Sequence, residues 1–341
     1  MRLASIRAGR LAGRRRAPPG FALPSVLFVV AMVTLVFLVA IEALTSLAVE
    51  TRRVKTSVAF QADALSLEAR TAFLASTGPL GPSGVLRDDP NAPVLLALDG
   101  RPYAAGPDLT VSAQDEAGLI NLDNISAAGQ ARLFAAMGVS APDQSVMADR
   151  LGDYMDVHDL KRPQGADVAD YARAGLATPP KGLLVQRGQL LGLLGWDQMV
   201  GGPLWRAFAD NVTADPSSTA TNINTATAAT LEVLYGLTPG QAQLAVAGRA
   251  AAPYGELEDL GRTVGMALPS DAERSYTMPN GRFALKVEDA DAGFIYRSRL
   301  ILSPDDATRP FWVVESTLSQ LSSAERASVP AHAPHFPDPT D

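Results

Sequence analysis

Cysteine is absent from this chain of 341 residues. Its absence excludes disulfides, thiol catalysis and thiolate metal sites, so the fold must be stabilised by packing and, at most, by hard cations. Only three histidines are present, at positions 158, 332 and 335, which argues against a histidine-based metal site. The G-x-S-x-G, H-E-x-x-H and P-loop patterns are missing as well, so we expect a protein that is not an enzyme.

Acidic residues are missing from the first 20 positions, which hold six arginines. The next segment, Phe21–Ile41, carries no charge, and from Ser25 to Thr77 there is neither glycine nor proline. At ~1.5 Å per residue, the uncharged segment spans the ~30 Å hydrocarbon core of a bilayer. The arginines should stay in the cytoplasm and send Glu42 and the residues after it across the membrane.

The apolar segment continues directly into amphipathic sequence. A cleaved secretory signal would instead have an apolar stretch of about 7–15 residues followed by small residues at a cleavage site. Here charged residues from Glu50 to Arg70 are interleaved with apolar ones, and Gly78-Pro79 is a helix stop. We therefore predict one long helix that crosses the membrane and packs its C-terminal half on a head domain.

The junction Pro19-Gly20-Phe21-Ala22-Leu23-Pro24-Ser25 resembles the processing site of type IV prepilins and pseudopilins. The resemblance implies that a prepilin peptidase cleaves after Gly20 and methylates the amine of Phe21. Most members of the family have glutamate at the fifth mature position, where this chain has Ser25. In a fibre, that glutamate neutralises the N-terminal amine of a neighbouring subunit, since a buried unpaired charge is costly. Its loss fits a subunit at the tip and is a feature of the GspK family, the large minor pseudopilins of type II secretion systems.

Strand-like alternation of apolar and polar residues occurs at both ends of the head sequence. Val94–Leu98, Asp99-Gly100 and Pro102-Tyr103 indicate a hairpin, and Leu109–Ala113 a further strand. After a long helical block, three more strands are indicated at Phe283–Glu288, Gly293–Leu302 and Phe311–Leu318.

We therefore predict an α+β fold. A pilin-like long N-terminal helix packs on an antiparallel sheet, and a large all-α domain with a helix-hairpin-helix-like unit is inserted. The expected parts are a basic leader at 1–20, the transmembrane part of the helix at 21–41, the first part of the pilin-like domain at 42–115, the inserted domain at 116–276, the C-terminal strands at 277–320 and a disordered, proline-rich tail at 321–341.

Two segments of the inserted block also resemble the GspK family. Asp115-Glu116-Ala117-Gly118-Leu119-Ile120-Asn121-Leu122-Asp123 is similar to the D-x-x-G-x-(I/F)-N-L-N segment, and we interpret it as a turn with capping side chains. Asp149–Tyr171 resembles a second, acidic motif, although His158 stands where the family has an aspartate. Asp153, Asp156 and Asp159 recur at every third position, which predicts one helical side before Pro163.

The family binds calcium in its head, and carboxylate clusters suit calcium. The resemblance thus implies a calcium site, for which the candidate ligands are Asp153, Asp156, Asp159, Asp167 and Asp170. The alternative is a solvated acidic face whose aspartates cap helices. The spacing is not that of an EF-hand.

Asn222–Gly265 indicates a helix-hairpin-helix-like unit, in which Asn224 or Thr225 caps the first helix and Gly236 and Gly240 flank the turn. DNA-binding units of this kind need positive charge, whereas this one has Arg249 and Arg262 against four acidic residues. Without the six leader arginines, the whole chain has 23 lysines and arginines against 36 acidic residues, a net charge of −13. A packing or protein-contact role is favoured, and no nucleic acid partner is expected.

Two functions remain. By resemblance, the chain is a minor pseudopilin at the tip of the type II secretion pseudopilus, single-pass in the inner membrane with its C-terminal head in the periplasm. It would initiate assembly with other minor pseudopilins and the major pseudopilin, after processing by a prepilin peptidase, for protein export across the outer membrane. The alternative is a membrane-anchored extracytoplasmic DNA receptor that uses the hairpin unit.

Overall fold

The structure is a computed structural model that describes residues 22–87, 89, 93–158, 160–200, 202–268, 275–306, 308–328 and 332–338. The chain divides into two units, Met1–Val58 and Ala59–Asp341. The described part of the first unit is helical and belongs to α1 (Ala22–Thr77), and the second unit is the head, which includes the later residues of α1. The predicted helix without a break from Ser25 to Thr77 is confirmed.

Within the described ranges, α1 is the one helix that is long and apolar enough to cross a membrane. All side chains from Leu23 to Lys55 are exposed. Large apolar side chains such as Phe28 and Phe37 are more than half exposed, at 66% and 63%. An apolar surface of this extent suits lipid or other apolar helices rather than water.

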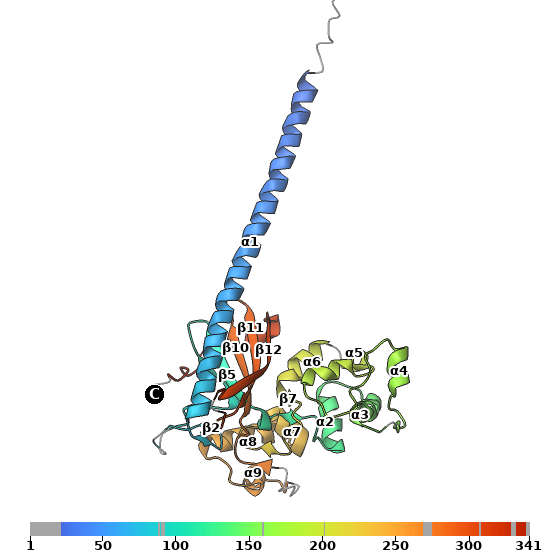
Figure 1. The fold of residues 1–341 in the computed structure, drawn as a ribbon, viewed down its shortest axis with the longest axis vertical. Helices are drawn as coiled ribbons and strands as arrows, with labels where there is room; N and C mark the ends of the chain where they lie inside the picture. Colours follow the sequence, from blue (N-terminus) through green and yellow to red (C-terminus); the bar gives the residue numbers. More distant parts are fainter. Residues whose placement is uncertain are drawn as a thin grey trace, which may run out of the picture. The chain divides into compact units, whose positions relative to one another are not determined.

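The head contains a five-stranded antiparallel sheet with the order β12-β11-β10-β5-β4. Its strands come from both ends of the head sequence, as predicted (Figure 1). They are β4 (Asp99–Ala104), β5 (Leu109–Asp115), β10 (Arg282–Asp289), β11 (Phe294–Leu302) and β12 (Phe311–Gln320). The central pairing joins β5 to β10, with Val111 opposite Val287. The predicted α+β class is confirmed.

The head part of α1 packs on one face of this sheet. Phe60 stacks on Phe294 of β11 with 5.9 Å between the ring centroids. Further along the helix, Leu67 and Leu74 are buried in the same apolar core as Leu285 and Val287 of β10. Alternate residues of the strands therefore form the core, and the residues between them face away from α1.

The predicted hairpin at residues 94–103 is wrong. β3 (Leu96–Ala97) pairs with β2 (Gly84–Val85), and β2 also pairs with β1 (Leu80–Gly81). β4 instead pairs with β5. Gly100 has a positive φ of 80°, as a turn residue would, but it lies within a β-bulge of β4 rather than at a hairpin tip.

Between β5 and β10 the chain is mainly helical. The helices are α2 (Ala127–Ala136), α3 (Ala141–Met155), α4 (Val168–Arg173), η2 (Arg187–Gly192), α5 (Trp196–Met199), α6 (Gly202–Phe208), η3 (Ala209–Asn211), α7 (Ala228–Tyr235), α8 (Pro239–Ala251) and α9 (Leu257–Val264), after η1 (Glu116–Gly118). Short parallel pairs join β6 (Ile120–Asn121) to β7 (Val212–Thr213) and β8 (Thr221–Asn222) to β9 (Ser275–Tyr276). Two apolar cores result, one around Trp196 and Phe134 and one around Leu231 and Leu260.

The prediction of a disordered tail is wrong for its described residues. α10 (Ser323–Ser328) follows β12, and Phe336 is buried in the core of the sheet, edge-on to Tyr103. Backbone bonds join Ala104 to Pro334 and Phe336 at 2.7 and 2.8 Å. The prolines of the tail suit an extended segment, and one aromatic side chain anchors that segment beside β4.

Candidate functional site

The exposed side of α1 in the head carries an apolar stripe, defined as Ala62, Leu65, Ala69 and Phe73. Its members are three or four residues apart and therefore lie on one side of the helix. Leu65 and Phe73 are 46% and 49% exposed, although buried residues of the same helix pack on the sheet. This stripe is suited to pack against another helix, because exposed apolar surface at helical spacing gains stability when it is covered.

The predicted processing residues, Gly20 and Phe21, lie outside the described residues. Ser25 lies in the first turns of α1 and its side chain is exposed. No carboxylate occurs in α1 before Glu42, which follows the uncharged segment. A subunit with this helix offers no negative charge in its apolar segment to a neighbour's terminal amine.

The acidic motif is organised around Asp153, a buried residue of α3. Its carboxylate accepts a hydrogen bond from Arg162 Nη1 at 2.7 Å and from the backbone N–H groups of Arg162 and Ala166, both at 3.1 Å. Two glycines make room for this pair. A Cβ on Gly165 would lie 1.7 Å from Asp153 Oδ2, and a Cβ on Gly152 would lie 2.6 Å from Arg162 Cζ.

The other described aspartates of the motif are engaged separately. Asp156 accepts hydrogen bonds from the backbone and ring of His158 at 2.9 and 3.0 Å, and these bonds lower the pKa of its carboxyl. Asp170 forms ion pairs with Lys161 and Arg173, and the hydrogen bond from Lys161 is the main cause that lowers its pKa to about 2. Asp167 caps α4 in a capping box with Asp170.

The predicted helical side is wrong, because α3 ends at Met155 and Asp156 already has an extended backbone. Within the described ranges, no group of three or more histidine or acidic side chains is placed to hold a metal. Arg162, Lys161 and backbone N–H groups use the carboxylate oxygens that a calcium ion would need, so the described aspartates do not fit that ion. Asp159 lies outside the described residues, and the full five-residue site stays a prediction.

The helix-hairpin-helix-like unit has its own core, which includes Leu231, Ala245 and Leu260. Thr227 caps α7, rather than the predicted Asn224 or Thr225, while Gly236 ends the helix with a φ of 70°, as expected. Asn224 instead is fully buried, and its side chain bonds to Tyr254.

Neither arginine of this unit is placed for phosphate. Arg249 is buried and donates to the carbonyl oxygens of Ile223 and Ala226, which stabilises the turn before α7. Arg262 is exposed but forms ion pairs with Asp259 and Glu256. The unit therefore favours the packing interpretation over DNA binding.

Asp115 ends β5 and joins three segments of the head. Its fully buried carboxylate accepts hydrogen bonds from Thr225 Oγ1 at 2.7 Å, Asn222 Nδ2 at 2.9 Å and the backbone of Ala117 at 3.2 Å. Burial is the main cause that raises its pKa to about 6. The sequence predicted the cap of the turn, but not the bonds across about a hundred residues to Asn222 and Thr225.

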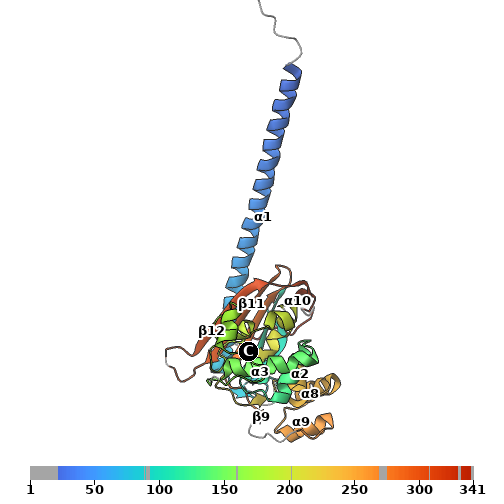
Figure 2. The ribbon, with the colours of Figure 1, turned by 90° about the vertical axis from the view of Figure 1, so that its right-hand side faces the viewer.

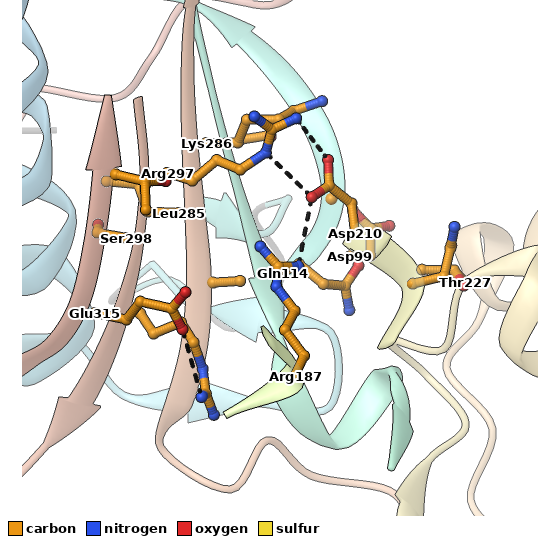
Figure 3. Close-up of a pocket in the computed structure, with 16 residues that line it drawn as sticks. Asp99, Gln114, Arg187, Asp210, Thr227, Leu285, Lys286, Arg297, Ser298 and Glu315 are labelled. Atoms are coloured by element: carbon orange, nitrogen blue, oxygen red, sulfur yellow. Dashed lines mark hydrogen bonds and ion pairs between the residues drawn. The ribbon is translucent and has the colours of Figure 1, made fainter. Parts of the chain in front are cut away.

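A polar cleft of about 210 Å³ lies on the sheet face turned away from α1 (Figure 3). Arg297 of β11 donates to Asp210 of η3 at 3.1 and 3.3 Å, and Arg187 of η2 lies 3.5 Å from the same carboxylate. Although burial raises the pKa of Asp210, the two arginines hold it below its usual value. These pairs fix the helical part to the sheet.

A second, more deeply buried pair lies beside this cleft. Arg299 of β11 donates to both oxygens of Glu116 in η1, at 2.5 and 2.7 Å. Neither Arg297 nor Arg299 was predicted from the sequence as a functional residue. The sequence does contain a signal for them, because Arg297 and Arg299 are two residues apart in a predicted strand and must lie on the same face of it.

A long N-terminal helix packed on an antiparallel sheet, with a helical part between the strands, defines a pilin-like protein. The family model described as "Type II secretion system (T2SS), protein K" matches residues 109–216. No curated protein matches the chain.

Among solved structures, the chain is similar to one in "The Crystal Structure of the GspK-GspI-GspJ complex from enterotoxigenic Escherichia coli Type 2 Secretion System". The identity is 14%, the TM-score is 0.50, and the match covers 80% of this chain and 98% of that chain. At this identity the likeness shows a shared fold. The family match and the fold together support the GspK minor pseudopilin family, to which the sequence resemblance pointed.

Proposed function

We propose that the protein is the minor pseudopilin at the tip of a type II secretion pseudopilus, where it initiates assembly with other minor pseudopilins for export across the outer membrane. The observation that carries the proposal is α1: an uncharged segment with Ser25 at the fifth mature position continues into the exposed apolar stripe. Such a helix offers its neighbours a packing surface but no carboxylate for a neighbour's amine.

The proposed setting follows from the same helix. A prepilin peptidase removes the leader after Gly20, the uncharged segment anchors the chain in the inner membrane, and the head lies in the periplasm. The partners are the other minor pseudopilins and the major pseudopilin, and the role is structural rather than enzymatic. The acidic hairpin unit opposes the alternative of a DNA receptor.

The first test is the N-terminal mass of the chain extracted from membranes, made with and without a prepilin peptidase. A species that begins at N-methylated Phe21, seen only with the peptidase, supports the proposal. An uncleaved chain, or one cut beyond Ile41, contradicts it.

The second test is co-purification of the full chain with the other minor pseudopilins of its system. Phe73→Lys places a charge in the apolar stripe and should lower recovery of the complex at least tenfold. Leu191→Lys is the matched control, because Leu191 is 51% exposed but lies in η2. Equal recovery of wild type and Phe73→Lys would show that the stripe is not the assembly surface.

A further inference from the structure

The two edges of the five-stranded sheet differ. β4 forms one edge, and the tail lies along it through the bridge of Ala104 with His335 and the bonds from Ala104 to Pro334 and Phe336. β12 forms the other edge, and within the described ranges no strand pairs with its outer side. Figure 2 shows β12 at a margin of the head.

β12 is long for an open edge and lacks the usual protection. It has ten residues, with neither lysine nor proline, and its one charged side chain, Glu315, lies 3.8 Å from Arg299 of the neighbouring strand. Natural proteins commonly protect an edge with lysine, proline, a short strand or a covering segment. A bulge can also protect an edge, and β12 has one opposite Arg299 and Leu300.

β12 exposes apolar side chains on both faces of the sheet. Val313 and Leu318 lie opposite Leu300 and Tyr296, on the face of α1, and are 42% and 37% exposed. Trp312 lies on the other face and is 42% exposed, and the bulge residue Val314 is 47% exposed. An incoming strand would cover apolar surface on both faces at once.

We infer that β12 is a docking edge for an extended strand of a second pilin-like subunit, which adds a sixth strand to the sheet. Every second backbone N–H and C=O of an edge strand points outward, and only another extended backbone satisfies such a row. The partner strand carries apolar side chains opposite Val313 and Leu318. This inference rests on the proposed function, which brings other pilin-like subunits beside the head.

The occupant we infer is a different subunit rather than a second copy, because the proposed position at the tip of the pseudopilus brings other pilin-like subunits beside this head. A second copy of the chain is an outcome that the test distinguishes.

The test is hydrogen exchange on the full-length chain in detergent, alone and in complex with the other minor pseudopilins of its system. We expect the amides of Phe311–Gln320 to exchange about tenfold more slowly in the complex. Side-chain contacts alone would not protect alternate amides along one strand. Peptides from α9 provide the internal control, because that helix lies in the hairpin unit.

Two variants test the same surface by recovery of the complex. Val314→Lys changes a residue that has no partner in the register of β11, so the fold should tolerate it, and Leu318→Lys places a charge on the edge. Each should lower recovery at least tenfold, while Leu191→Lys should not.

Each remaining outcome overturns the inference. If the complex forms but β12 exchanges as before and both variants assemble normally, the proposed function stands and the docking edge is wrong. If wild type forms no complex, both fail. Protection of β12 in the chain alone, rising with concentration, would identify a second copy as the occupant.

Discussion

Tyr296 of β11 donates its hydroxyl to the carboxylate of Glu68 in α1 at 2.8 Å, and both side chains are buried. Burial is the main cause that raises the pKa of Tyr296 to about 12, and the nearby Glu68 adds to it. The bond joins the helix that continues into the membrane anchor to the strand beside the open edge. It is a polar contact among the apolar side chains, such as Leu67 and Val287, that join α1 to the sheet.

Tyr296→Phe should destabilise the head by about 1–3 kcal/mol, because it leaves a buried carboxylate without this donor. Thermal unfolding of the full chain in detergent measures the loss. Leu65→Ala is the control on the exposed side of the same helix and should change stability by about 0.5 kcal/mol or less. The double variant Glu68→Leu with Tyr296→Phe should be less destabilised than the sum of the two single changes, and simple additivity would contradict the assigned bond.

The sheet could be predicted from the sequence because its strands alternate in a local pattern. Phe283, Leu285 and Val287 of β10 are buried, whereas Ala284 and Lys286 between them are only half-buried, which is the pattern of a strand with one face in the core. The tail could not be predicted, because nothing near Phe336 reveals that its ring packs against Tyr103, more than two hundred residues earlier. The composition of a segment indicates whether it is locally flexible, but it does not reveal whether a distant residue anchors it.

The acidic motif shows a similar limit. The carboxylates could be found from their spacing, but their counter-charges could not. Arg162 pairs with Asp153 across a loop in which Gly165 permits close approach, and this geometry depends on backbone turns that spacing does not encode. The sequence therefore predicted a cluster that needs positive charge, whereas the structure supplies that charge from within the chain.

Asp115 should make stability depend on pH. Its pKa is about 6 in the folded head and 3.8 in the reference state, so the folded state binds the proton more tightly. The resulting stabilisation is complete below about pH 3.8 and is lost as the pH rises through 6, at up to about 1.4 kcal/mol per pH unit. Other carboxyls with lowered pKa values, such as Asp170, act in the opposite direction, so the comparison must be with Asp115→Asn.

Melting temperatures of wild type and Asp115→Asn between pH 4 and 7 provide this comparison. Asp115→Asn should be less stable than wild type at pH 7. Its side-chain NH2 group replaces an oxygen that accepts a hydrogen bond, and an NH2 group that faces the donor Asn222 cannot accept one. The difference between the two proteins should be greatest at the acidic end, where wild type gains its proton. A difference that does not change with pH would contradict the raised pKa.

Processing should depend on Gly20 and not on Ser25. Gly20→Ala should leave the leader attached when a prepilin peptidase is present, and mass spectrometry of the extracted chain measures this. Ser25→Glu should be cleaved as wild type is. Secretion should not require a glutamate at this position. Cleavage and assembly of Gly20→Ala at the wild-type level would contradict the pilin-like class.

The acidic motif should not depend on calcium for its stability. Since Arg162 and Lys161 already neutralise the described carboxylates, a chelator should leave the melting temperature of the head unchanged. Arg162→Gln should lower stability by about 1–3 kcal/mol, because Asp153 then stays buried without its charged partner. The guanidinium of Arg162 is itself 40% exposed, which keeps this cost below that of a fully buried ion pair. A fall of several degrees on chelation in wild type would instead support the calcium prediction.

Gly165 should be the least tolerant position of that motif. A methyl group there would lie 1.7 Å from Asp153 Oδ2, so Gly165→Ala must displace the carboxylate or the loop that carries Arg162. The cost should be about 2 kcal/mol or more, as for other overpacked or bond-breaking changes. Gly188→Ala is the matched control, because no atom lies within 4 Å of its added methyl group, and a compatible glycine-to-alanine change is neutral or stabilising by up to about 1 kcal/mol. If the two variants had equal melting temperatures, Gly165 would not lie as close to the carboxylate of Asp153 as the structure shows.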